Sequence, residues 1–140
     1  MVHFQSENGY VPEVITDVVR LWIESVTKSH GFQLGEINYF FCTDEYILQT
    51  NRQYLNHDYY TDIITFDYSL NNVISGDLII SLDTVKSNAD LLNISYNTEL
   101  LRVVIHGILH LCGFKDKTKE EEVKMRELED QALNLYTTFK

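Results

Sequence analysis

The segment from His106 to Asp116, which reads His-Gly-Ile-Leu-His-Leu-Cys-Gly-Phe-Lys-Asp, has the residue types and spacing of a metal site. On a helix, His106 and His110 would share one face with their Cβ atoms about 5–6 Å apart, so both imidazoles could bind one zinc ion. Gly113 can end that helix in a left-handed conformation, and the returning chain would bring Asp116 to the ion as a third ligand. Three protein ligands leave a position for water, which is typical of a catalytic zinc site.

Other interpretations of the same segment remain open. The two histidines could be half-buried helix residues bonded to neighbouring backbone, but the added glycine and aspartate favour a metal site. Cys112 could be a ligand, although its place at the helix end favours a small buried thiol. Metzincin peptidases have a similar spacing and carry a glutamate directly after the first histidine as general base. Because Gly107 occupies that position, the segment predicts a metal site without the peptidase base.

The composition is that of one globular domain spanning residues 1–140, with a net charge of −10. No stretch is long and apolar enough to cross a bilayer, and the first residues do not resemble a secretory signal, so we expect no membrane association. Cys42 and Cys112 do not form a disulfide framework, and we expect a reduced, cytoplasmic protein. The negative charge argues against tight non-specific binding to nucleic acid.

Several basic residues follow the metal segment, namely Lys115, Lys117, Lys119, Lys124 and Arg126. Because acidic residues 120–122 are interleaved with them, we interpret this stretch as the solvated start of a helix. The alternative is a local basic surface beside the active site of an otherwise acidic protein.

The elements that must position the metal segment can be predicted from hydrophobic periodicity and capping residues. In the first half of the chain we expect strands at Val2–Phe4 and 37–42, a helix with Pro12 in its first turn that ends near Gly31, and a helix from the N-cap Thr43 to about Leu55.

The second half of the chain continues with further strands and helices. We expect strands at 62–67 and 76–82, joined by turns over 69–75, and then a helix from Asp83 or Thr84 to about Leu92. The next helix begins at the cap Asn97 or Thr98 and includes both metal histidines. The last helix runs from the capping box Thr118–Glu121 to about Tyr136. Together these elements predict an α+β fold, with a four-stranded mixed sheet packed with about five helices.

Three blocks of the sequence occur in an order and spacing that resemble one known family. The blocks are His106 to Phe114, Asn51 to Tyr54 with the following Asp58 to Phe66, and Gly76 to Ile80. From about residue 40 onward, the chain resembles the YbeY family of bacterial metal-dependent endoribonucleases. The resemblance implies a zincin-like fold with one zinc ion, and late maturation of ribosomal RNA at the 3′ end of the small-subunit rRNA. It also implies ribosome quality control, with the ribosomal small subunit and single-stranded rRNA as partners.

The chain departs from the family pattern at two positions. Asp116 occupies the place of the family's third histidine ligand, and a carboxylate oxygen is an acceptable substitute at zinc. Leu55 occupies the place of a family arginine that would pair with phosphate, and leucine cannot donate a charge-assisted hydrogen bond. Another cation must therefore assist in cutting RNA. Lys115 and Lys117, which flank Asp116, are the nearest in sequence, and Arg52 lies one helical turn before Leu55.

Our leading hypothesis is metal-assisted hydrolysis of RNA, with zinc on His106, His110 and Asp116 activating water and polarising a phosphoryl oxygen. The first alternative is a non-catalytic, zinc-stabilised ribosome-assembly factor, which Leu55 and the acidic composition favour. A metallopeptidase is the second alternative, and Gly107 argues against it.

The residues that would assist this chemistry are less well defined. The sequence identifies no general base: Asp58, Asp62 and Asp77 lie in the family-like blocks, but such residues commonly serve as caps or turn residues, which we favour. Tyr59 or Tyr60 could stack on the bases of single-stranded RNA, and the same pair could instead be part of the core before a strand.

Overall fold

The structure is a computed structural model that describes residues 1–56 and 61–139. Its centre is a mixed sheet of the strands β1 (Val2–Ser6), β2 (Gln33–Cys42), β3 (Ile63–Asp67) and β4 (Val73–Ser81). The spatial order is β1-β2-β4-β3, in which β1, β2 and β4 are parallel and β3 is antiparallel to β4. The last strand in this order, β3, is therefore an edge strand.

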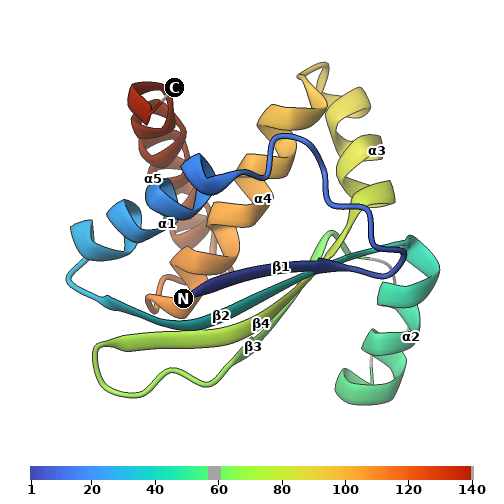
Figure 1. Ribbon diagram of the computed structural model, residues 1–140, viewed down its shortest axis with the longest axis horizontal. Helices are drawn as coiled ribbons and strands as arrows, with labels where there is room; N and C mark the ends of the chain where they lie inside the picture. The colour runs from blue at the N-terminus through green and yellow to red at the C-terminus, as the bar shows by residue number, and fades with distance from the viewer. Residues whose placement is uncertain (57–60, 140) are drawn as a thin grey trace.

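Five α-helices surround this sheet (Figure 1). They are α1 (Asp17–Ser29), α2 (Asp44–Leu55), α3 (Leu82–Leu92), α4 (Tyr96–Leu111) and α5 (Lys119–Tyr136), and a short 3-10 helix, η1 (Thr137–Phe139), follows. Helices α1, α4 and α5 share the main core on one face, while α2 packs on the other face through a smaller cluster of Cys42, Ile47 and Ile64. The predicted α+β fold with a four-stranded mixed sheet and about five helices is confirmed.

The close packing of α4 on the sheet explains why His106 and His110 lie near the edge strand β3. Buried and partly exposed residues alternate along most of β4, and Ile74, Leu78 and Ile80 are buried in the main core. A Cβ atom on Gly107 would lie only 3.0 Å from Leu78 Cδ2 and Ile63 Cδ1. The absence of a side chain at Gly107 therefore lets α4 approach β3 and β4 closely, and a glutamate there would have to enter an apolar contact.

Several capping predictions are confirmed by the structure. The Thr43 side chain accepts a hydrogen bond from Tyr46 N at the start of α2. At the start of α5, Thr118 Oγ1 accepts from Glu121 N, and the Glu121 carboxylate accepts from Thr118 N. This reciprocal pair is the predicted capping box, and it fixes where the chain enters α5 after the metal segment.

Three helix starts differ from the prediction. Helix α1 begins at Asp17, because the Pro12 carbonyl accepts from Ile15 N in a separate turn. Ser95, rather than Asn97 or Thr98, caps α4, since its hydroxyl accepts from Thr98 N. Helix α3 begins at Leu82, one residue earlier than expected, because Ser81 caps it by accepting from Thr84 N.

Three strands are longer than predicted, and β1 continues to Ser6. Strand β2 begins at Gln33 and β4 at Val73, and these two residues pair across the sheet. An irregularity between Leu34 and Ile37 shifts the register there, which obscures the alternation in the sequence. Within the described residues, no helix is both long and apolar enough to cross a membrane.

Candidate metal centre

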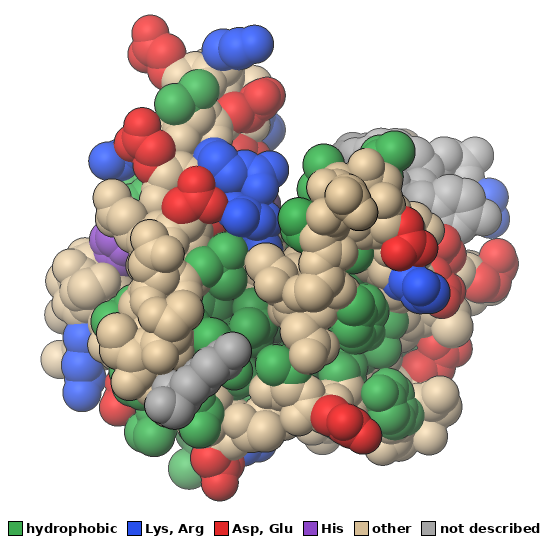
Figure 2. Space-filling view, turned by 90° about the horizontal axis from the view of Figure 1, so that it is seen from above, with side chains coloured by type: hydrophobic (Ala, Val, Ile, Leu, Met, Phe, Trp, Pro, Cys, Tyr) green, Lys and Arg blue, Asp and Glu red, His purple; other side chains and the backbone are tan. Residues whose placement is uncertain are grey.

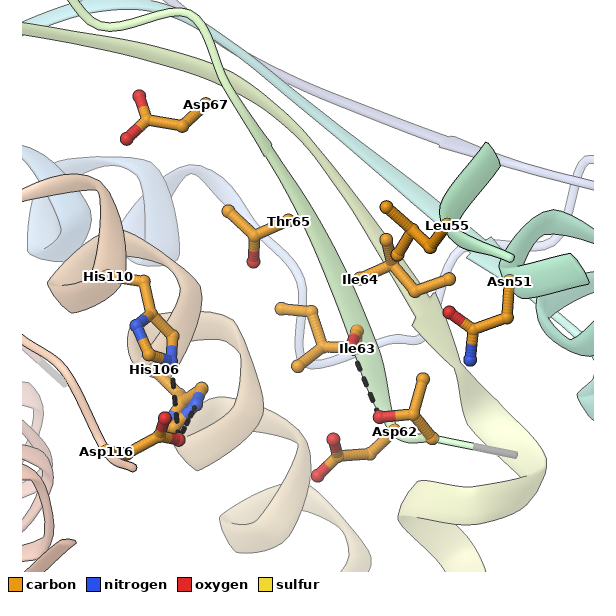
Figure 3. A pocket seen from close by; sticks show the side chains of 11 residues that line it. Asn51, Leu55, Asp62, Ile63, Ile64, Thr65, Asp67, His106, His110 and Asp116 are labelled. Carbon is orange, nitrogen blue, oxygen red and sulfur yellow. Dashed lines mark hydrogen bonds and ion pairs between the residues drawn. The ribbon is translucent and has the colours of Figure 1, made fainter. Parts of the chain in front are cut away.

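The side chains of His106, His110 and Asp116 converge beside the edge strand. The two histidines lie one turn apart on α4 with their ring centroids 4.5 Å apart, and Asp116 follows on the segment that leads to α5. Asp116 Oδ2 lies 3.3 Å from His106 Nε2 and 3.3 Å from His110 Nε2. One ligand atom from each residue lies within 4.8 Å of the others, so the three predicted ligands could hold a metal ion together (Figure 3).

The helix exit that returns Asp116 to the histidines is built around Gly113. This glycine has φ +96°, a conformation that other residues rarely adopt. Its N–H donates to the His110 carbonyl, and Phe114 N donates to the Leu109 carbonyl, so the last turn of α4 closes on itself. Cys112 is buried at this exit and outside the ligand cluster, and burial raises the pKa of its thiol to about 11. It is therefore a buried thiol, as its position in the sequence favours.

A backbone contact fixes the orientation of the His110 ring. His110 Nδ1 lies 2.9 Å from the Phe114 carbonyl oxygen. Because a carbonyl oxygen only accepts hydrogen bonds, Nδ1 must carry a proton, which leaves Nε2, on the side of Asp116, as the nitrogen that can bind a metal. The turn at Gly113 thus positions Asp116 and also selects the His110 tautomer that can bind a metal.

The His106 ring is held by a buried ion-pair network. His106 Nδ1 lies 2.6 Å from Glu129 Oε2, and Glu129, on α5, is only 4% exposed. Its other oxygen accepts from Arg102 Nη1 at 3.0 Å, and Arg102 Nη2 pairs with Asp130 at 3.0 Å. A carboxylate behind a metal-binding histidine orients the ring and increases its basicity. Glu129 and Arg102 thus support the candidate site from outside it.

Glu129 and Arg102 were not predicted from the sequence. The available signal was a glutamate within the apolar stripe of α5, between the buried Leu128 and Ala132. Buried glutamates are rare unless they are paired, so this position could have indicated a partner on a neighbouring helix. The partner itself is 23 positions away in sequence and becomes visible only in the structure.

Charges around His106 change its pKa. Burial lowers the pKa of His106, but the hydrogen bond and charge of Glu129, with further contributions from Asp116 and Asp62, outweigh it and raise the pKa above its ordinary value. Burial also raises the pKa of Asp62. The negative potential at His106 that favours a proton also favours a divalent cation.

The donor geometry fits a small divalent cation. For zinc bonded at 2.0–2.1 Å, a tetrahedral angle places neighbouring ligand atoms about 3.3 Å apart. Both contacts of Asp116 Oδ2 with histidine Nε2 atoms are 3.3 Å. Two imidazole nitrogens and one carboxylate oxygen are ordinary zinc ligands, and all three side chains remain partly accessible. The residues present therefore suit a zinc ion with one side open to solvent.

The candidate ligands lie in a pocket of about 490 Å³, which we call the larger pocket. Strand β3 crosses it between α4 and the end of α2, with Thr65 and Asp67 on its length and Asn51 and Leu55 on the α2 side (Figure 3). Leu55, the departure from the family arginine, therefore lies at this pocket. Among the described residues, no lysine or arginine lines it.

The other candidate site residues predicted from the sequence lie partly inside and partly outside the larger pocket. Asp62 lines the larger pocket, whereas Asp77 lies outside it and accepts hydrogen bonds from Asn38 and Tyr68. Lys115 lines a separate pocket beside Gly113, and Lys117 and Arg52 are exposed and do not line the larger pocket. Asp58, Tyr59 and Tyr60 lie outside the described residues.

Comparison with known families and proteins identifies the family of this chain. The sequence profile of the family described as Endoribonuclease YbeY matches residues 1–137. The chain belongs to the YbeY family. A curated Endoribonuclease YbeY from Bacteroides thetaiotaomicron is 53% identical over 132 residues, covering 94% of this chain and 96% of the relative. One from Porphyromonas gingivalis is 52% identical over 132 residues, covering 94% and 87%.

A solved structure supports the same fold. The solution structure of a Thermotoga maritima protein matches with a TM-score of 0.70 and 26% identity, covering 99% of this chain and 93% of that one. The resemblance to the YbeY family is therefore confirmed along the whole chain. The YbeY relatives carry the name endoribonuclease, which supports a hydrolase that acts on RNA and argues against a peptidase.

Proposed function

We propose that this chain is a zinc-dependent endoribonuclease specific for single-stranded RNA, with one zinc ion held by His106, His110 and Asp116. The observation that carries the proposal is the pair of 3.3 Å contacts between Asp116 Oδ2 and the two Nε2 atoms, at the wall of an open pocket. Membership in a family of named endoribonucleases supplies the substrate class.

When bound, zinc supplies activation of water near neutral pH and polarisation of a phosphoryl oxygen. The chain's own residues prepare the site. The Phe114 carbonyl accepts from His110 Nδ1 and so leaves Nε2 for the metal, and Glu129 orients His106. The pocket of about 490 Å³ has room for a phosphate with its nucleoside, which suits a strand whose bases are unpaired and can be splayed out.

The wider role that we propose is late maturation of ribosomal RNA at the 3′ end of the small-subunit rRNA, together with ribosome quality control. The ribosomal small subunit would then be the partner, and the reaction would occur in the cytoplasm, where the two free cysteines would stay reduced. The family relationship supports this role.

Replacement of His110 by alanine tests the proposal. It removes one of the three ligands, so the variant should retain little zinc and should cleave a single-stranded RNA oligonucleotide at least about a hundredfold more slowly. Bound zinc is measured by elemental analysis, and cleavage by gel electrophoresis of a labelled oligonucleotide. Cleavage at the wild-type rate after loss of the metal would contradict the proposal.

A ribosome-assembly factor that uses zinc only for stability remains the second candidate, because the described lining of the larger pocket holds no lysine or arginine to bind phosphate. Zinc removal separates the two functions. For the assembly factor, a chelator should lower the thermal stability while wild-type protein shows no cleavage with or without metal. For the endoribonuclease, cleavage should require zinc and return when zinc is restored.

A further inference from the structure

The larger pocket has a charge that does not suit its proposed substrate. Its described lining includes the carboxylates of Asp62, Asp67 and Asp116 and no lysine or arginine. An RNA strand carries phosphates on both sides of the bond that is cut, and single-stranded RNA binds largely through cations that contact such phosphates. A cation that holds the substrate must therefore lie beyond this lining.

A smaller pocket of about 130 Å³ adjoins the larger one, because Asp62 and His106 line both. It lies between α4 and α5, and its lining combines Arg102 and Arg126 with the carboxylates of Glu99 and Glu129. Figure 2 shows Lys and Arg side chains gathered beside a hollow on the face that carries the helices. These two arginines thus lie next to the candidate metal site. Arg102 is one helical turn before His106 on α4, and Arg126 lies on α5.

The two arginines differ in how they are engaged. The Arg102 side chain is 16% exposed and donates to Glu129 at 3.0 Å, with a second contact to Asp130 at 3.0 Å. The Arg126 side chain is 57% exposed, and its Nη1 lies 3.8 Å from Glu129 Oε1, which is too long for a hydrogen bond. Arg102 thus makes the close contact with Glu129, and more than half of the Arg126 side chain remains accessible to solvent.

We propose that Arg126 binds a phosphate of the RNA strand next to the one that is hydrolysed. The strand would then run from the larger pocket past His106 and over α5. The planar guanidinium can donate two parallel hydrogen bonds to a phosphate, which Leu55 on the opposite side of the pocket cannot provide. This inference rests on the proposed endoribonuclease function and names the residue that holds its substrate.

Substitution of Arg126 by glutamine tests the proposal, because it removes the charge and keeps a similar length. A flanking phosphate is bound equally in the substrate and in the transition state, so KM for a single-stranded oligonucleotide should rise about tenfold with kcat within about twofold. The slope of log kcat/KM against log salt concentration should become shallower by about 0.7, the value for one phosphate contact on a single strand. Arg126→Lys should recover part of the loss.

The control is Lys86→Gln, which removes another exposed cation paired on its own helix, here with Asp90 at 3.5 Å. Lys86 lies on α3 and lines neither pocket, so KM and the salt slope should stay at wild-type values. Zinc affinity is measured for each variant. An Arg126→Gln variant that loses zinc affinity and kcat together would overturn the proposal, because Arg126 would then act through Glu129 and His106.

Unchanged KM and salt slope in Arg126→Gln would also overturn the proposal and leave the endoribonuclease function standing. If zinc-loaded wild-type protein cleaves no RNA, the proposed function fails. The role of Arg126 is then tested by measuring the binding of the same labelled oligonucleotide with fluorescence anisotropy. Weaker binding with a shallower salt dependence in Arg126→Gln would support the phosphate contact, and binding equal to wild type would overturn it.

Discussion

Replacing Glu129 by glutamine should weaken metal binding although Glu129 is not a proposed ligand. Its two oxygens accept from His106 Nδ1 at 2.6 Å and from Arg102 Nη1 at 3.0 Å. A glutamine has one oxygen and one NH₂ group, so it cannot accept from both donors at once, and the negative charge behind His106 is lost. Loss of such a supporting carboxylate typically lowers metal affinity 10–100-fold, which corresponds to about 1.4–2.7 kcal/mol.

The assay is a competition titration of zinc against a chromophoric chelator at pH 7.5, with circular dichroism to verify that the variant is folded. Asp130→Asn is the matched control, since it disturbs the 3.0 Å contact with Arg102 Nη2 but does not touch His106. We expect its zinc affinity to stay within about twofold of wild type. A folded Glu129→Gln variant with wild-type zinc affinity would refute the supporting role of Glu129.

Two further predictions follow from the pKa shifts of buried groups. Glu129 outweighs the effect of burial and raises the pKa of His106. In chelator-treated protein, the pair of His106 and Glu129 should therefore stabilise the fold below about pH 6.5. This contribution to the free energy of unfolding should be lost as the pH rises through the raised pKa. Urea denaturation at several pH values should show this loss in wild type and not in Glu129→Gln; an equal pH dependence in both would contradict it. Burial raises the pKa of Cys42 to about 12 and that of Cys112 to about 11, so both thiols should react with a disulfide reagent at pH 8 at least about tenfold more slowly in the folded than in the denatured protein. Equal rates in the two states would show that the thiols are not protected.

Local features of the sequence were sufficient to predict much of the candidate site. The spacing of His106, His110, Gly113 and Asp116 specifies a helix, its exit and three converging side chains, because each relation spans only a few residues. The caps at Thr43 and Thr118 were equally predictable, since a cap bonds to residues three positions away. Pro12 was misleading because proline fits a turn as well as a first helical turn, and the turn is what forms.

Relations between distant segments could not be predicted in the same way. The strand order β1-β2-β4-β3 depends on pairing between segments far apart in the chain, and nothing local specifies it. The same holds for Glu129, which becomes a partner of His106 only because α5 packs against α4. Sequence proximity indicates Lys115, Lys117 and Arg52 as cations in place of Leu55, whereas the fold brings Arg126, on α5, into a pocket that Asp62 and His106 also line.

The most direct test of the metal centre is an anomalous-difference map at the zinc absorption edge, from crystals of the zinc-loaded protein. One peak should lie within bonding distance, about 2.0–2.2 Å, of His106 Nε2, His110 Nε2 and Asp116 Oδ2, with a water molecule in the remaining position. A map without a peak at this position, or with a fourth protein ligand that closes the site, would contradict a catalytic metal centre.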